Sequence, residues 1–228
     1  MLFRRSKSVS IFGIRAVGKT AYLVMLINQL SKMVNIRDMH FHSGLDYYMK
    51  MMQWILRGDG PQPTKPADRI LIHIKMKIEN KGVEIRTLDV AGGDIENMGE
   101  VFKMLIEGGD GYIFLVEPTP DPERKVTQVW LIYKLVEYLT QGFRYKVKKP
   151  LAIAFTKNDI YGIKDPKKFF LEYTKPVYNL EQVLTRVKKH EFFAISSYGG
   201  DLEELKMQGL EPKPVNVEKP FLWVVENS

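Results

Sequence analysis

The sequence predicts an α/β fold, with a mostly parallel six-stranded sheet between two layers of helices. Short apolar, strand-like runs alternate with helix-like segments, which is the pattern of α/β proteins. The segment ENKG, residues 79–82, separates two of these runs and signals a hairpin, so one strand should be antiparallel. The hydrophobic content is 45% of 228 residues, which is enough to bury a sizeable core.

Six apolar runs are the candidate strands, and helix signals lie between them. A helix should start at Lys19, and Asp121 before Pro122 is the N-cap signal of a helix that should run to about Gly142. Asn179 followed three residues later by a glutamine is a capping-box pattern, which predicts a further helix. The six runs cover residues 8–12, 70–78, 83–90, 112–117, 151–155 and 192–195.

Residues 1–228 are expected to form a single domain with one insertion and a late final helix. The insertion covers about residues 37–68, with a strand near His40, an amphipathic helix over residues 45–56 and a loop rich in Gly and Pro. The final helix is expected at about residues 217–225, where an apolar cluster should cover the sheet. No internal repeat interrupts this organisation.

Composition limits the class of protein. The chain has no cysteine, which excludes disulfides and thiolate metal sites and favours a cytoplasmic location. The net charge is +7, but lysines and glutamates are scattered, so the excess is more typical of a solvated surface than of a nucleic-acid interface. No apolar run reaches the roughly 20 residues needed to span a bilayer. The N-terminal MLFRRSK could touch anionic lipid transiently but is too short to anchor the chain alone.

The segment GIRAVGKT, residues 13–20, has the spacing GxxxxGKT between a predicted strand and a predicted helix. This is the phosphate-binding P-loop pattern. Its glycines let backbone N–H groups surround phosphate oxygens, and the helix directs its N-terminus at the same anion. Lys19 would contact the β- and γ-phosphates, and the Thr20 hydroxyl would bind Mg²⁺.

A second motif, DVAG at residues 89–92, lies at the end of the predicted strand at 83–90. The Asp89 carboxylate can hold Mg²⁺ through water, and the Gly92 N–H can contact a γ-phosphate. An ordinary turn after a strand has the same pattern, so DVAG alone is weak evidence.

Two further motifs concern the base. Thr156, Lys157 and Asp159 form TKxD, whose aspartate can accept hydrogen bonds from guanine N1–H and N2–H₂, donors that adenine lacks at those positions. Ser196 and Ser197 end the last predicted strand, where a backbone N–H could meet guanine O6. A solvated Lys–Asp pair in a loop is the alternative interpretation of TKxD.

With four motifs in this order, residues 8–198 resemble the Ras-like small GTPases, within the P-loop GTPase class. The chain looks prokaryotic, and GIRAVGKT and LDVAGGD are nearest to the Arf-like branch. The resemblance implies the Ras-like fold, binding of GTP and GDP with Mg²⁺, GTP hydrolysis, a protein effector or regulator, and two switch segments that tighten on the γ-phosphate. It places at the nucleotide Gly13, Arg15, Ala16, Val17, Gly18, Lys19, Thr20, Ala21, Thr156, Lys157, Asp159, Ser196 and Ser197.

The resemblance also requires a threonine in the first switch that binds Mg²⁺. Thr64 is the only threonine between Thr20 and Ile70 and shortly precedes the strand expected to be antiparallel. An ordinary turn threonine is the alternative. The metal ligands would then be Thr20, Thr64 and Asp89, and the catalytic residues Lys19, Thr64, Gly92 and Arg15.

Two departures from the family concern hydrolysis. Gly93 stands where many relatives have a glutamine that orients the attacking water, and Asp94 or Glu96 would have to substitute for it. Arg15 stands at a position usually held by a small residue. Its side chain could stabilise transition-state charge, block an arginine supplied by a partner, or turn to solvent.

The sequence therefore favours a GTPase switch with slow intrinsic hydrolysis of GTP. Gly93 and Arg15 keep a second function open, a GTP-loaded binding module with little or no hydrolysis. A P-loop ATPase or kinase is the third candidate. Its test is the comparison of GTP and ATP affinity.

Overall fold

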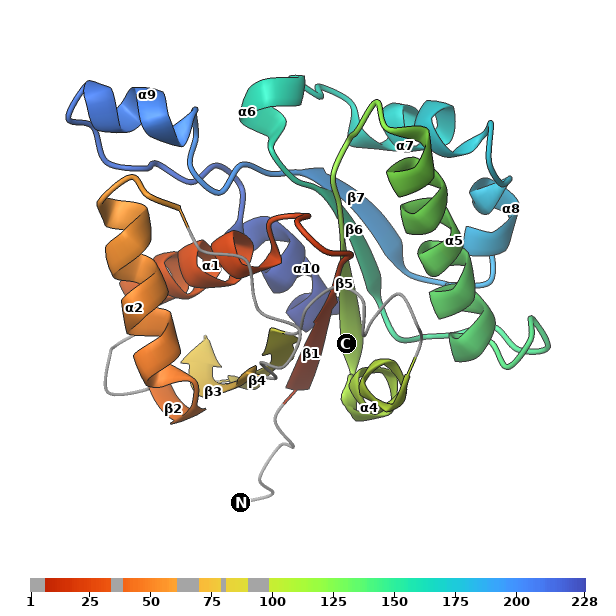
Figure 1. Ribbon diagram of the computed structural model, residues 1–228. Helices are drawn as coiled ribbons and strands as arrows, with labels where there is room; N and C mark the ends of the chain where they lie inside the picture. Colours follow the sequence, from red (N-terminus) through yellow and green to blue (C-terminus); the bar gives the residue numbers. More distant parts are fainter. Residues whose placement is uncertain (1–6, 34–38, 61–69, 79–80, 90–98) are drawn as a thin grey trace, which may run out of the picture.

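A seven-stranded sheet forms the centre of the computed structural model, which describes residues 7–33, 39–60, 70–78, 81–89 and 99–228 (Figure 1). Its strand order is β2-β3-β4-β1-β5-β6-β7. The strands are β1 Lys7–Phe12, β2 Met39–Ser43, β3 Ile70–Ile78, β4 Lys81–Asp89, β5 Gly111–Val116, β6 Leu151–Phe155 and β7 His190–Ala194.

The strand directions confirm the predicted α/β class. β1 pairs in parallel with β4 and β5, and β6 pairs in parallel with β5 and β7. β3 is antiparallel to both of its neighbours, β4 and β2, and so is the one antiparallel strand that the hairpin signal predicted. The sheet has seven strands and not six, because β2 from the expected insertion pairs with the outer edge of β3, with Met39 opposite Met76.

The strands in the middle of the sheet are apolar along their whole length because both faces are covered. Every residue of β5 and of β6 is buried, as expected for parallel strands between two helical layers. Helices α1 (Lys19–Met33) and α10 (Glu218–Asn227) lie on one face, and α4 (Glu100–Gly108), α5 (Pro122–Leu139) and α7 (Pro166–Thr174) on the other (Figure 1). Helix α2 (Leu45–Leu56) packs on α1.

Two helix-end predictions need correction. Asp121 caps α5 by accepting from the N–H of Glu123, as predicted, but α5 ends at Leu139 and not near Gly142. Gln141 has φ 51° and Gly142 has φ 69°, so the chain leaves the helical conformation there. Helix α8 (Leu180–Leu184) does start after Asn179, but the asparagine side chain makes no capping hydrogen bond.

Three short helices were not predicted: α6 (Asn158–Tyr161), α7 and α9 (Leu202–Met207). Two carry aspartate caps, whose pattern is present in the sequence. Asp165 accepts from the N–H of Lys168 in front of a proline, and Asp201 accepts from the N–H of Glu203 and of Glu204. Within the described ranges, no helix has both the length and the apolar character that crossing a bilayer requires.

Candidate nucleotide-binding site

The residues of the predicted motifs that the structure describes lie at the ends of strands, at one edge of the sheet. Gly13 comes directly after β1, Thr156 directly after β6, and Ser196 shortly after β7. These strands are parallel, so their carboxyl ends lie at the same edge, where ligands of open α/β sheets bind. We call residues 13–20 the phosphate loop, 156–159 the base loop and 196–199 the serine loop.

The phosphate loop has a backbone that ordinary residues rarely adopt. Ala16 and Gly18 both have positive φ, 61° and 88°. A Cβ on Gly13 would lie 2.6 Å from Cγ1 of Val17, so the loop can close tightly only with glycine there. Helix α1 starts at Lys19, whose side chain is buried, and Thr20 is half-buried beside it. The N–H groups of the first helical turn therefore face the loop, as an anion site requires.

Neighbouring elements hold the phosphate loop by its carbonyl groups. The Thr156 hydroxyl, which is buried, donates to the Val17 carbonyl at 2.9 Å. The Arg124 Nη2 donates to the Arg15 carbonyl at 3.3 Å. Thr156 thus joins the base loop directly to the phosphate loop. The Arg15 side chain is exposed.

The base loop is ordered by the strand on its other side. The N–H of Asn158 donates to the Ile195 carbonyl at 3.0 Å, at the end of β7. Lys157 has φ 56° and ψ 37°, an uncommon conformation for a residue with a Cβ. The Asp159 side chain is exposed, so its carboxylate is accessible to a ligand.

The backbone N–H groups of the two serines in the serine loop differ in their hydrogen bonding. The N–H of Ser196 donates to the Val215 carbonyl at 3.0 Å and is therefore occupied. The N–H of Ser197 makes no hydrogen bond to any residue that the structure describes. Of the two predicted residues, Ser197 is thus the one that could donate to guanine O6. Gly199 has φ 75°, and a Cβ there would lie 2.1 Å from the Lys213 carbonyl, so the returning chain packs directly on this loop.

Tyr198 is a residue of this site that the sequence did not reveal. Its ring packs against an apolar cluster of α1 and α2 that includes Met25 and Met51. Burial raises the pKa of the Tyr198 hydroxyl, and the negative charge of Asp159 raises it further. The aromatic ring therefore packs beside α2, and Asp159 of the base loop is close enough to affect the Tyr198 hydroxyl. The only sequence signal was its position directly after the two serines.

Glu117 is the second residue that sequence reasoning missed. It follows β5 and is buried, with 9% of its surface exposed. One carboxylate oxygen accepts from the Lys157 ammonium group, and the other accepts from Arg124 Nη2 at 2.5 Å. We call these three residues the Glu117 cluster. Lys157 is 40 residues from Glu117 in the sequence, and no motif connects the three residues.

Part of the predicted site lies outside the described residues. Thr64, Gly92, Gly93, Asp94 and Glu96 fall there, so their predicted roles stay predictions. Asp89 is the last residue of β4, and β4 pairs with β1, the strand that leads into the phosphate loop.

The donor types that would serve Mg²⁺ are oxygens, as this ion prefers. Thr20 offers a hydroxyl at the start of α1, and Asp89 offers a carboxylate at the end of a strand beside β1. These residue types and positions fit the ion. Among the described residues, no group of three or more His, Cys, Asp or Glu could hold a metal.

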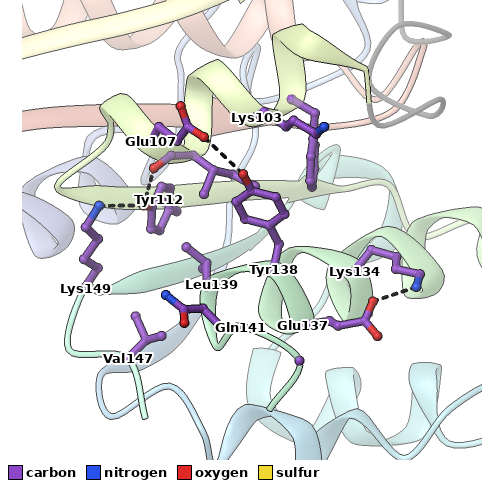
Figure 2. A pocket seen from close by; sticks show the side chains of 13 residues that line it. Lys103, Glu107, Tyr112, Lys134, Glu137, Tyr138, Leu139, Gln141, Val147 and Lys149 are labelled. Carbon is purple, nitrogen blue, oxygen red and sulfur yellow. Dashed lines mark hydrogen bonds and ion pairs between the residues drawn. The ribbon is translucent and has the colours of Figure 1, made fainter. Parts of the chain in front are cut away.

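A groove of about 840 Å³ lies elsewhere, between α4, α5 and the chain before β6 (Figure 2). Its polar groups bind one another: Lys149 Nζ donates to the Tyr112 hydroxyl at 3.1 Å and to the Gly109 carbonyl at 2.6 Å, at the end of α4. The Tyr138 hydroxyl donates to Glu107 (Figure 2). These contacts fix the end of α4 to the sheet, and none of the described motif residues lines the groove.

Comparison with known proteins gives the fold. A scan against protein-family models finds no match, and neither does a search of curated proteins. Among solved structures, the chain is similar to the S. cerevisiae Ski7 GTPase-like domain, which was crystallised bound to GTP. The two are 12% identical with a TM-score of 0.56, over 84% of this chain and 43% of the other. The chain thus spans less than half of that neighbour's length. At this identity the likeness establishes the fold alone: the chain has the fold of a P-loop GTPase-like domain.

Proposed function

We propose that the chain binds GTP and GDP with Mg²⁺ and hydrolyses GTP slowly, as a nucleotide-dependent switch. The observation that carries the proposal is the hydrogen bond from Thr156 to the Val17 carbonyl. It joins a phosphate-binding loop to a loop with a guanine-specific pattern, so one nucleotide could contact both. The GTP bound by the structural neighbour is consistent with this ligand.

Each described residue has a defined part in this proposal. Lys19 and the first turn of α1 neutralise and bind the phosphates, and Thr20 gives its hydroxyl to Mg²⁺. Asp159 accepts from the guanine N1–H and N2–H₂, and the Ser197 N–H donates to O6. The ion would neutralise charge that develops on the phosphate oxygens during hydrolysis. A protein that recognises the GTP-bound form would complete the switch.

The first test is nucleotide choice. A fluorescent GDP analogue bound to the purified chain should be displaced by GTP and GDP but not by ATP at similar concentration. The discrimination should be roughly 10⁴-fold, because adenine leaves the Asp159 carboxylate without a donor. As a control, Lys134→Ala on α5, which removes a lysine that forms an ion pair with Glu137, should keep the same nucleotide preference. Equal displacement by ATP would favour the ATPase or kinase alternative.

The second test is hydrolysis in a single turnover. Arg15 belongs to the phosphate loop and has an exposed side chain, so it could reach the γ-phosphate or simply face solvent. If it stabilises the transition state, Arg15→Ala should slow hydrolysis at least ~10-fold while GDP affinity stays unchanged. If it obstructs the site, the same substitution should leave the rate unchanged or raise it. Tight GTP binding without measurable hydrolysis in the unmodified chain would favour the binding module.

A further inference from the structure

Glu117 connects two loops that each contact a different end of the proposed nucleotide. Its Oε1 accepts from Lys157 of the base loop. Its Oε2 accepts from Arg124, and the same Nη2 of Arg124 also donates to the Arg15 carbonyl of the phosphate loop. A continuous path of charge-assisted hydrogen bonds therefore runs from one loop to the other through a single buried carboxylate.

The backbone of Glu117 is fixed on the side of α5. The buried Gln128 amide accepts from the Glu117 N–H at 2.7 Å and donates to the Glu117 carbonyl at 2.9 Å. The Tyr173 hydroxyl also donates to this carbonyl, at 3.3 Å. Burial raises the pKa of Tyr173 to about 12, so the hydroxyl stays protonated and keeps donating at neutral pH. The carboxylate is thus held at a fixed place between the loops.

Lys157 shows what this fixed carboxylate does to the base loop. The residue has a positive φ, a conformation that costs free energy when the residue has a Cβ. Its ammonium group donates to Glu117, and the N–H of the next residue, Asn158, donates to the carbonyl of Ile195, directly after β7. The loop is therefore held on both sides. Asp159, the proposed base ligand, follows two residues after Lys157.

We propose that Glu117 is a positioning residue that couples the base loop to the phosphate loop and so determines how long the protein retains a guanine nucleotide. The inference rests on the proposed function. When Glu117 holds Lys157 and Arg124, neither loop can open without disturbing the other. A nucleotide bound at both ends then leaves only when both loops open together.

Glu117→Gln tests the coupling, because it keeps the size of the side chain and removes the charge. Losing one member of a buried, hydrogen-bonded charge pair acts mainly on dissociation rates, so GDP should leave at least ~10-fold faster. Arg124 and Lys157, once released from Glu117, would attract the phosphates and so oppose faster dissociation. Their side chains are 32% and 39% exposed, so solvent screens this attraction, and it should be the smaller effect.

The matched control is Glu84→Gln. Glu84 is also a buried glutamate with two basic side chains beside it, but it is on β4 and pairs with Ser8 near the start of β1, at the opposite end of the sheet. Dissociation of a fluorescent GDP analogue should be measured by stopped flow for the unmodified chain and both variants. The Glu84 variant should stay within about twofold of the unmodified chain, as expected for a distant, independent site.

A double-mutant cycle separates positioning from a general loss of structure. If Glu117 acts through Arg124, then Arg124→Met should speed dissociation in the unmodified chain and add little to Glu117→Gln. Additive effects, or equal dissociation from the Glu117 and Glu84 variants, would overturn the coupling while leaving the proposed function intact. Failure of the unmodified chain to bind GDP would instead overturn the proposed function, and the inference with it.

Discussion

Two buried glutamates in this protein have similar chemistry and different surroundings. Glu84 on β4 lies 3.2 Å from Lys75 Nζ and 3.5 Å from His73 Nε2, and we call these three residues the Glu84 cluster. Glu117 also lies between two basic side chains, Lys157 and Arg124. Their residues are 6% and 9% exposed, so burial alone does not distinguish them.

The difference lies in where the neighbouring basic side chains come from. Lys75 and His73 are both on β3, directly beside β4, so the Glu84 cluster lies within one hairpin. The partners of Glu117 come from α5 and from the base loop, so its cluster joins separate elements at the carboxyl edge of the sheet. Position in the fold, and not the type of interaction, therefore decides which cluster we expect to affect a ligand.

The largest expected effect is at Lys19, in the phosphate loop that Arg124 of the Glu117 cluster contacts. Lys19→Ala should weaken GTP and GDP binding by ~100-fold or more, because the phosphates lose a buried cation. Lys75→Ala, which removes a cation of the Glu84 cluster, should leave both affinities unchanged. Titration with a fluorescent GDP analogue measures both. Equal affinities for the unmodified and the Lys19 chains would remove the phosphate loop from the site.

The next effect concerns the base. Asp159→Asn should lose its preference for guanine and gain one for xanthine, whose O2 accepts where the guanine amino group donates. The change in ranking should be at least ~10-fold, because buried polar groups are left unpaired with the wrong base. Competition between GDP and XDP measures it. An unchanged ranking would mean that TKND is an ordinary loop. The base loop, to which Lys157 of the Glu117 cluster belongs, would then not contact a base.

At Glu84 we expect a moderate effect on stability and no effect on nucleotide binding. Glu84→Gln leaves the charge of Lys75 without its partner, but the lysine side chain is 44% exposed, so solvent compensates part of the loss. The free energy of unfolding should fall by about 1–2 kcal/mol, below the full cost of breaking a buried pair. Urea denaturation measures this. Weaker GDP binding at unchanged stability would contradict the contrast between the clusters.

The smallest effect is expected at an ion pair that is exposed. Lys206 on α9 binds Asp59, in the loop after α2, at 2.7 Å, and both side chains are about half exposed. Lys206→Ala should therefore change the free energy of unfolding by less than about 0.5 kcal/mol. Thermal denaturation and GDP dissociation, followed together, should both stay near the values of the unmodified chain. A large change in dissociation would show that α9 also acts on the nucleotide.

Local patterns were enough to predict the fold class, because strand-like runs, a hairpin and a glycine-rich turn are each encoded within a few residues. The spacing GxxxxGKT also predicted the backbone break between β1 and α1, which the structure has at residues 13–18. The edge strand β2 was expected near His40, but nothing in its sequence specified that it would pair with β3.

The Glu117 cluster could not be predicted, because its contacts depend on three elements meeting in space. Glu117 and Arg124 are separated by a turn, and Lys157 follows the next strand of the sheet. Lys157 was predicted as part of TKxD, but Glu117 and Arg124 look like ordinary charged surface residues in the sequence. Tyr198 was missed for the same reason, since only the packing of α2 on α1 gives its ring an apolar surface to cover.

The seventh strand has a consequence for association between molecules. An exposed edge strand offers unpaired backbone groups to other chains and can start aggregation. The hairpin of β3 and β4 would have such an edge, but β2 covers the middle part of it, from His73 to Met76. The edge is thereby moved to a strand of only five residues with an irregular register and two exposed histidines. Short, irregular and polar edges are poor templates for further pairing, so β2 protects part of the longest hairpin of the described sheet from edge-to-edge association.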